Sequence, residues 1–395
     1  MSRYPSGRQG RHYVATVALD RDALETFALN LVRTPSPSGQ EGAVADLVRP
    51  EMERLGYAVE VDALGNVVGT LDFGPGPCVL FDAHMDTVGV TDPAAWSVEP
   101  FGELRDGRLY GRGSMDMKGP LAAVIHGAAA AAAGGGRVVV SASIAEEMIE
   151  GYATVDVARR VRPDVAVICE ATARRVAVGQ RGRAELTVEV FGSPTHSSRP
   201  ELGVNAVEAM ADVLRAAREI ALPTHPELGR AILVPTDIAS RPYPALSVVP
   251  DHCIVTFDRR TLPGEREEDV VEQLRAAVDA AVAPHGARGQ VTLAVDRFDS
   301  YSGAAVEAPN FADAWFTDPA APPASTALAA VGAEPHYWMF CTNGSGTAAL
   351  GIPTLGYGPG DETLAHRVDE FIELDELHAG AEGYATLAAA LTAGG

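Results

Sequence analysis

The segment PCVLFDAHMDTV, residues 77–88, is the strongest indication of the fold class. It begins with a short apolar run at residues 77–81, which is typical of a buried strand. Helical patterns and further apolar runs alternate along the chain, at residues 118–133, 137–142, from 154 onward and at 164–169. Buried strands that alternate with helices predict an α/β fold: a mainly parallel sheet with helices on both faces.

The pattern changes from about residue 179. The segment RAELTVEVFG, residues 183–192, alternates polar and apolar side chains, as a half-exposed strand does. Two strand–helix units follow, with helices expected at residues 204–220 and 265–282 and strands at 245–259 and 291–295. We therefore expect a smaller α+β domain, residues 179–300, inserted into a catalytic domain of residues 1–178 and 301–395.

Composition excludes several classes of protein. The 395 residues include 31 Lys and Arg against 53 Asp and Glu, a net charge of −22, which argues against a nucleic-acid partner. The most apolar stretch, residues 121–133, is too short to cross a bilayer. The N-terminal residues lack the apolar segment of a signal peptide, and the four cysteines form no CxxC pair. We expect a cytoplasmic protein that binds neither membrane nor nucleic acid.

Acidic and histidine residues follow the predicted strands or precede the next helix. They are His84, Asp86, Asp116, Glu146, Glu147, Glu170 and His366. The carboxyl ends of strands in an open α/β sheet converge on one crevice, so these side chains can meet although they are distant in sequence. Two histidines with several carboxylates form a ligand set suited to zinc or a similar divalent ion.

Local spacing suggests how this set divides its roles. Asp86 lies two residues after His84, so on an extended segment it can orient the imidazole; Asp82 is the alternative by the same alternation. Glu146 and Glu147 are neighbours that point apart, so one can bind metal while the other acts as a general base. The carboxylate of Asp116 can bridge two metals about 3.5–4 Å apart.

A family resemblance extends over nearly the whole chain. The segments that carry it, in order, are AHMDTV (83–88), WSVEPFGELRDGRLYGRGSMDMKG (96–119), SIAEEMIEG (143–151), CEAT (169–172), SPTHSSRP (193–200), DRRTLPGE (258–265) and GYGPGDETLAHRVDE (356–370). Together they resemble the M20 metallopeptidase/deacylase family, which includes acetylornithine deacetylase, succinyl-diaminopimelate desuccinylase, aminoacylases and carboxypeptidase G.

The resemblance implies a role for each residue of the set. One metal is expected on His84, Asp116 and Glu170, and the other on Asp116, Glu147 and His366. Glu146 is then the base and Asp86 the orienter. The metals are expected to be zinc, with cobalt or manganese as alternatives. The inserted domain is implied to be a lid and dimerisation domain, whose His196 reaches the partner subunit's site in a homodimer and stabilises the oxyanion.

Three further residues are candidates for substrate contact. The planar guanidinium groups of Arg260 and Arg181 suit a substrate carboxylate. Asn343 lies in the loop CTNGSG, residues 341–346, which replaces a TDAR-like sequence of many relatives. That loop, together with GYGPGDE, resembles the branch known as selenium-metabolism hydrolases. Ala83 stands where glycine is usual in the family.

These features predict a dinuclear zinc amidohydrolase that removes an N-acyl group from an amino-acid-like substrate. Glu170, where some peptidase relatives carry aspartate, favours deacylation. The alternatives within the family are a dipeptidase or carboxypeptidase and an N-carbamoyl hydrolase. A metal-free binding protein that keeps the fold is the alternative of another class. A nucleotide-binding protein is disfavoured, because GRGSMDMKG lacks the spacing of a phosphate loop.

Overall fold

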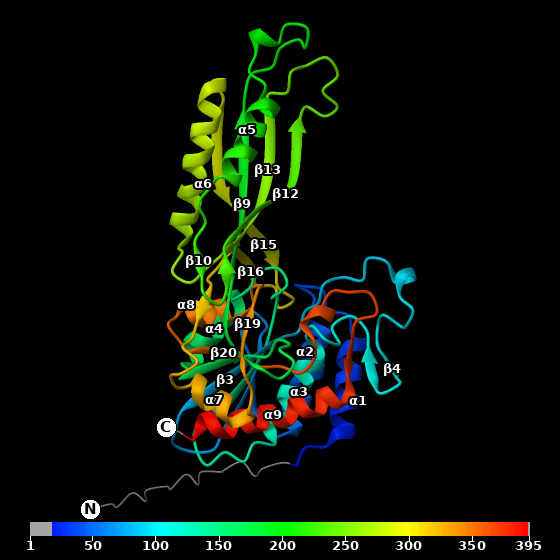
Figure 1. The fold of residues 1–395 in the computed structure, drawn as a ribbon. Helices are drawn as coiled ribbons and strands as arrows, with labels where there is room; N and C mark the ends of the chain where they lie inside the picture. Colours follow the sequence, from blue (N-terminus) through cyan, green and yellow to red (C-terminus); the bar gives the residue numbers. More distant parts are fainter. Residues whose placement is uncertain (1–17, 394–395) are drawn as a thin grey trace, which may run out of the picture.

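A nine-stranded sheet forms the centre of the larger domain in the computed structural model, which describes residues 18–393 (Figure 1). Its strands, in spatial order, are β1 (Ala58–Val61), β2 (Val67–Asp72), β6 (Arg137–Ser143), β3 (Cys78–His84), β7 (Val165–Ile168), β20 (Thr354–Gly356), β8 (Val176–Gln180) and β18 (Trp315–Phe316), with β19 (Pro335–Trp338) also beside β8. The four central strands, β6, β3, β7 and β20, are parallel, and β1, β2 and β18 pair antiparallel. The prediction of a mainly parallel sheet is confirmed.

Strand β3 is buried along its whole length and is longer than the apolar run at residues 77–81 predicts. Parallel neighbours on both sides, β6 and β7, continue the ladder past Phe81, and the β3–β6 pairing extends to His84 opposite Ser143. His84 is therefore the last residue of a central strand. Its backbone is held by the sheet.

Helices cover both faces of this sheet, as predicted. On one face lie α1 (Arg21–Arg33), α2 (Gly42–Arg54), α3 (Lys118–Ala129) and α9 (Leu374–Thr392), and on the other lie α4 (Tyr152–Val161) and α8 (Gly344–Ala349), while α7 (Ala324–Val331) packs on α9. Helices α3 and α9 cross closely at Gly127, where a Cβ atom would lie 2.2 Å from the carbonyl oxygen of Ala381. Helix α3 ends at Ala129, four residues before the predicted end, because the chain then turns toward β6 through the glycines at 134–136.

The smaller domain is an antiparallel sheet with two helices on one face. Its main strands, in spatial order, are β12 (Ile232–Arg241), β13 (His252–Thr261), β9 (Gly182–Phe191) and β14 (Arg288–Leu293), and the short β17 (Phe311–Ala312) also pairs with β9. Helices α5 (Ala206–Arg218) and α6 (Glu267–Val282) pack on this sheet through an apolar core. Burial alternates strictly along β9, as its sequence pattern predicts.

Two features of the smaller domain differ from the predictions. The strand predicted at 245–259 begins only at His252, and residues 245–251 form a loop. Strand β12 was not predicted, because it is an exposed edge strand whose pairing register shifts after Pro235 and whose sequence does not alternate. Both faces of β12 are mostly exposed, so its sequence carries little periodic signal.

The boundaries between the domains also differ from residues 179 and 300. Strand β8, which ends at Gln180, belongs to the larger sheet, and only Arg181 separates it from β9. The hairpin of β15 (Val295–Asp299) and β16 (Ala305–Pro309) follows β14 and returns to the larger domain, where the hydroxyl of Tyr301 donates a 2.6 Å hydrogen bond to the carbonyl of Gly65. The chain thus crosses between the domains more often than one insertion requires. The lid and dimerisation roles stay predictions.

Two other expectations concern location. Among residues 18–393, no helix combines the length and apolar character that a bilayer span requires. All four cysteines are buried and free. The prediction that there is no signal peptide falls mainly on residues 1–17, which lie outside the described residues, and a cytoplasmic location stays a prediction.

Candidate metal centre

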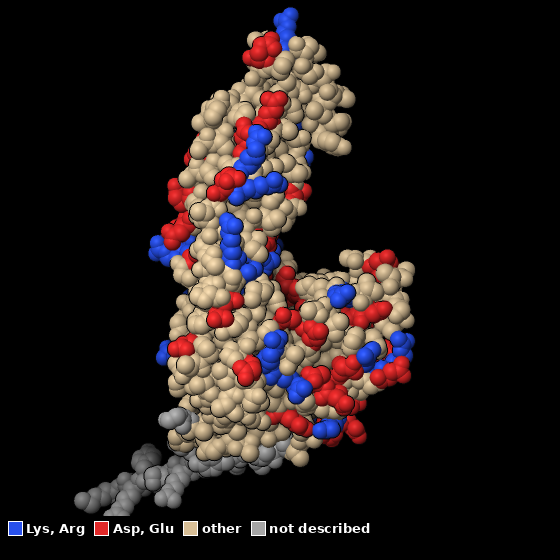
Figure 2. Space-filling model, viewed as in Figure 1, with Lys and Arg blue, Asp and Glu red and all other residues tan. Residues whose placement is uncertain are grey.

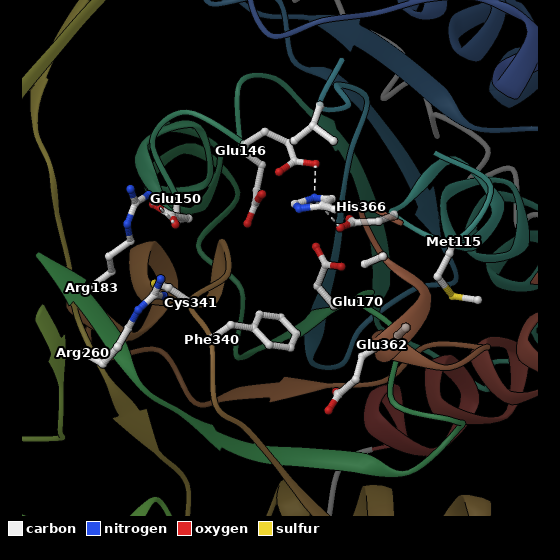
Figure 3. A pocket seen from close by; sticks show the side chains of 15 residues that line it. Met115, Glu146, Glu150, Glu170, Arg183, Arg260, Phe340, Cys341, Glu362 and His366 are labelled. Carbon is white, nitrogen blue, oxygen red and sulfur yellow. Dashed lines mark hydrogen bonds and ion pairs between the residues drawn. The ribbon is translucent and has the colours of Figure 1, made fainter. Parts of the chain in front are cut away.

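A cavity of about 420 Å³ lies where the two domains meet. Figure 2 shows the molecule hollowed between the smaller domain and the larger one, with acidic side chains on the floor of the hollow. Most of the cavity wall comes from the larger domain, and Arg183 and Arg260 come from strands β9 and β13 of the smaller one. In Figure 3 the side chains of Glu146, Glu170 and His366 point into the same space.

Strand ends deliver most of the predicted ligands to this cavity. His84 ends β3, Glu146 and Glu147 follow β6, and Glu170 follows β7. These three strands are parallel neighbours, so their carboxyl ends lie side by side. Two loops supply the rest: Asp116 lies just before α3, and His366 follows a short 3-10 helix, Glu362–Leu364.

The ligand atoms form two groups that share Asp116. In the His84 group, Nε2 of His84 lies 3.1 Å from Oδ1 of Asp116 and 3.4 Å from Oε1 of Glu170. In the His366 group, Nε2 of His366 lies 3.1 Å from Oδ2 of Asp116 and 3.0 Å from Oε1 of Glu147. Within each group the ligand atoms all lie within 4.8 Å of one another. The two oxygens of Asp116 thus face different histidines.

The orientation of His84 depends on its other ring nitrogen. Nδ1 lies 2.9 Å from the backbone carbonyl oxygen of Asp86 and 3.4 Å from its carboxylate Oδ1. A carbonyl oxygen only accepts hydrogen bonds, so Nδ1 donates to it and Nε2 faces the carboxylates. Asp86 therefore orients His84 mainly through its backbone, whereas the sequence predicted its side chain.

The carboxylate of Asp86 also accepts hydrogen bonds from the backbone of the two glutamates, a role that the sequence does not predict. Oδ1 accepts the backbone N–H of Glu146 and Oδ2 that of Glu147, each at 3.1 Å, and Oδ2 also accepts the hydroxyl of Ser38 at 2.6 Å. The two glutamates are thus held by their backbone while their side chains diverge. Ser38 lies in the segment TPSPSGQEG, whose sequence predicts only a break between two helices.

The electrostatics of this cluster suit bound cations. Burial, together with neighbouring carboxylates, raises the pKa of Glu146 well above its usual value and that of Glu170 to about 7. Hydrogen bonds that its ring donates to the carboxylates of Asp116 and Glu147 raise the pKa of His366 to about 10. Burial opposes ionisation of Asp116, but hydrogen bonds from His366 and His84 hold its pKa below its usual value. Crowded carboxylates that repel one another are stabilised by divalent ions, and imidazole with carboxylate is a donor set for such ions.

Comparisons with known proteins agree with this geometry. The family model described as "Peptidase family M20/M25/M40" matches residues 80–390. The chain belongs to this family. Over 363 residues it is 31% identical to the uncharacterized protein YgeY of Escherichia coli K12, an alignment that covers 87% of this chain and 88% of YgeY.

Other relatives of this M20 chain have named activities. It is 27% identical to an acetylornithine deacetylase of Photorhabdus laumondii, over 87% of this chain and 91% of that one. The structure of Bacillus subtilis YxeP, described as a dinuclear metal binding peptidase from the M20 family, superposes with a TM-score of 0.68 at 15% identity, covering 94% of this chain and 99% of that one. The predicted family, fold class and general activity, a metal-dependent hydrolase of amide or peptide bonds, are confirmed.

Of the three predicted substrate residues of the M20 chain, one lines the cavity and two do not. Arg260 lines the cavity, where Nε donates to Oδ1 of Asp258 at 2.8 Å. Arg183, which was not predicted, also lines it and pairs with Glu150. These two arginines stand directly opposite each other in the β9–β13 ladder, so both side chains leave the same face of the sheet. Arg183 is identified as a cavity residue by the pairing register of β9 and β13, which the sequence does not show.

Two predicted substrate contacts do not reach the cavity. Arg181 precedes β9, and its Nε and Nη2 donate to the carbonyl of Leu228 at 2.8 and 2.7 Å. Asn343 is buried: Nδ2 donates to Asp82 and Ser143, and Oδ1 accepts the backbone N–H of Gly151. Both polar atoms of the Asn343 amide thus have hydrogen-bond partners within the core. Neither Arg181 nor Asn343 is therefore in place to bind substrate.

The remaining site residues lie as follows. Asp82, the alternative orienter, accepts hydrogen bonds from Ser143 and Asn343. The carboxylates within 3.8 Å of the ring nitrogens of His84 belong instead to Asp86, Asp116, Glu146 and Glu170.

His196 forms a β-bridge with Val248 in the loops that follow β9 and β12. These loops lie at the end of the smaller domain that is farthest from the larger one (Figure 1). Arg183 of β9 lines the cavity, and eight further residues of this strand, 184–191, separate it from these loops. At a rise of about 3.3 Å per residue, the loop of His196 lies roughly 25 Å from the cavity of its own chain.

Proposed function

We propose that this M20 protein is a dinuclear amidohydrolase that removes the N-acyl group of an amino-acid-like substrate. The observation that carries the proposal is the shared carboxylate, because Oδ1 of Asp116 faces His84 and Oδ2 faces His366, each at 3.1 Å from Nε2. One ion would be held by the His84 group and the other by the His366 group. We propose zinc, with cobalt or manganese as alternatives, since all three accept imidazole and carboxylate ligands.

Glu146 is proposed as the general base. Metal ions at this centre would lower the pKa of a water and polarise the substrate carbonyl. Glu146 belongs to neither ligand group, lines the cavity and has its pKa raised by burial, so its carboxylate can take a proton from water and pass it to the leaving nitrogen. The backbone hydrogen bond to Asp86 keeps this side chain beside the ligands.

Arg260 is proposed to bind the carboxylate of the amino-acid part. It lies on the wall formed by the smaller domain, opposite the ligand groups, and is about one-quarter exposed to the cavity. A substrate carboxylate would compete with Asp258 for the planar guanidinium, which can bind two oxygens at once. The ligands and the arginine lie on different domains, so a bound substrate would join the two.

A homodimer is proposed to complete the site. Within the described residues, β12 pairs on one side only, with β13, and its edge carries the exposed side chains of Ile232, Val234 and Ile238. Such an edge can pair antiparallel with the same edge of a second copy, which gives a twofold interface. The dimer would carry His196 toward the partner's cavity, where its imidazole would stabilise the oxyanion.

The test is a substrate screen on the purified full chain with its metal content measured. The panel contains N-acetyl, N-succinyl and N-carbamoyl amino acids and dipeptides, each with zinc, cobalt or manganese. We expect two ions per chain, hydrolysis of an N-acyl amino acid, and loss of activity with a chelator that the metals restore. Cleavage of dipeptides or carbamoyl compounds alone would contradict deacylation, and an active protein without metal would contradict the whole proposal.

A further inference from the structure

A buried carboxylate lies beneath the metal centre and belongs to neither ligand group. The side chain of Glu370 is fully buried, and its Oε1 accepts three backbone N–H groups, from Gly113 at 2.9 Å, Met115 at 3.0 Å and Asp116 at 3.2 Å. The backbone carbonyl of Glu370 also accepts the N–H of Gly111. One residue near the C-terminal end of the chain thus holds the whole loop that carries the shared ligand Asp116.

The other oxygen of Glu370 extends this contact to the loop of His366. Oε2 pairs with Nη1 of Arg112, and Nη2 of the same guanidinium donates a 3.1 Å hydrogen bond to the backbone carbonyl of His366. The guanidinium also lies over the ring of Trp96, 5.5 Å from its centroid. Arg112 therefore joins the two loops that supply Asp116 and His366, although its side chain is in neither ligand group.

The two ligand groups are supported in different ways. His84 ends a central strand, its ring is 1% exposed, and the sheet holds its backbone. His366 follows a short 3-10 helix, its ring is 48% exposed, and its φ of +62° is unusual for a residue with a side chain. Outside the ligand groups, the contact from Arg112 to the carbonyl of His366 ties this loop to the loop of Asp116.

We propose that Arg112, held by Glu370, is a positioning residue that sets the affinity of the His366 group for its ion while the His84 group is largely independent of it. The inference rests on the proposed dinuclear function. Without the guanidinium, the carbonyl of His366 loses its donor and the exposed loop can move away from Asp116 and Glu147. His84 and Glu170 keep their places at the ends of β3 and β7. One ion should therefore become labile and the other should not.

The experiment is a calorimetric titration of the chelator-treated full chain with Zn²⁺ alone. We expect two ions in the wild-type protein. Arg112→Met should weaken one of them by about 10–100-fold, the range typical for loss of a partner that orients a ligand, and change the other by less than about threefold. Glu370→Gln keeps an oxygen for the three N–H groups but loses the charge that pairs with Arg112, so it should weaken the same ion.

Arg160→Met is the matched control. Arg160 makes ion pairs with Glu60, Asp62 and Asp156 away from the cavity, so this change removes more charge pairs than Arg112→Met yet should leave both ions unchanged. Arg112→Lys can keep the pair with Glu370 but lacks the fork that also reaches the carbonyl of His366, so its effect should be intermediate. Circular dichroism and thermal unfolding of the metal-free proteins show which variants are folded.

The outcomes separate this inference from the proposed function. Two ions bound as tightly by folded Arg112→Met and Glu370→Gln as by wild type would overturn the role of Arg112. Equal weakening of both ions would also overturn it, because it would indicate a general loss of structure. Fewer than two ions in the wild-type protein would instead contradict the dinuclear function on which the inference rests.

Discussion

Oδ1 of Asp86 accepts the backbone N–H of Glu146 at 3.1 Å, so the residue that orients His84 also fixes the proposed base. The second oxygen of the same carboxylate accepts the N–H of Glu147. With both backbones held, the two glutamate side chains diverge, and only that of Glu147 enters a ligand group. The division of roles between two adjacent and chemically identical residues therefore comes from one buried carboxylate.

The first prediction separates these two glutamates. Glu146→Gln should leave the metal content near two ions per chain but lower kcat by about 10²–10⁴-fold, the usual effect of removing a general base. Glu147→Ala should lose the ion of the His366 group. Metal analysis and kinetics on the same samples check both. If Glu146→Gln lost metal and Glu147→Ala kept it, the assignment would have to be reversed.

The second prediction compares the two arginines that the sequence predicts as substrate contacts. Arg260→Met should raise KM by about 10–100-fold, which corresponds to loss of a hydrogen bond to a charged group of roughly 1.5–3 kcal/mol. Arg181→Met is the matched control, because its guanidinium is bound to the carbonyl of Leu228, and its KM should stay near the wild-type value. Equal effects on KM in the two variants would show that Arg260 has no special role in binding.

The third prediction concerns pH and the buried carboxyl of Asp82. Burial raises its pKa to about 6, although Asn343 and Ser143 donate hydrogen bonds to Oδ2, and Oδ1 has no partner among the described residues. An unfolded aspartate titrates near pH ~4, so the folded state holds its proton more tightly. This contribution to the free energy of unfolding is fully present below pH ~4 and is lost as the pH rises through about 6, by about 3 kcal/mol in total.

Asp82→Asn removes this titration. The measurement is urea unfolding of the metal-free wild type and variant between pH 4 and 7.5. As the pH rises, the free energy of unfolding of the wild type should fall relative to that of the variant. A difference that does not vary with pH would mean that the carboxyl of Asp82 titrates alike in both states.

The fourth prediction tests the proposed dimer. His196→Ala and Glu146→Ala should each be nearly inactive, and mixing the two should restore activity, because a hybrid dimer has one intact metal centre facing one intact histidine. Loss of an oxyanion donor typically costs about 2.7–4 kcal/mol of barrier. The control is a mixture of Glu146→Ala with Glu147→Ala, which leaves no intact centre and should stay inactive. No recovery after proven subunit exchange would count against His196 acting across the interface.

Much of this fold follows from local pattern. Apolar runs before His84, Glu147 and Glu170 mark the central strands, and the rule that parallel strands end at one edge brings these residues together. Alternation marks β9 equally well. Local pattern fails where packing decides the outcome, as at β12, an exposed edge strand with little periodicity, and at Ala129, where α3 stops inside an alanine-rich run.

The family, the central strands and the residues of the two ligand groups can be predicted from the sequence, because each depends on short motifs and their order. Tertiary packing, in contrast, places Arg183 beside Arg260, turns Asn343 into the core and lets Arg112 and Glu370 join two ligand loops. The contact between Arg112 and Glu370 spans 258 residues of chain. Such contacts depend on strand register and on the packing of distant segments, which leave no periodic signal in the sequence.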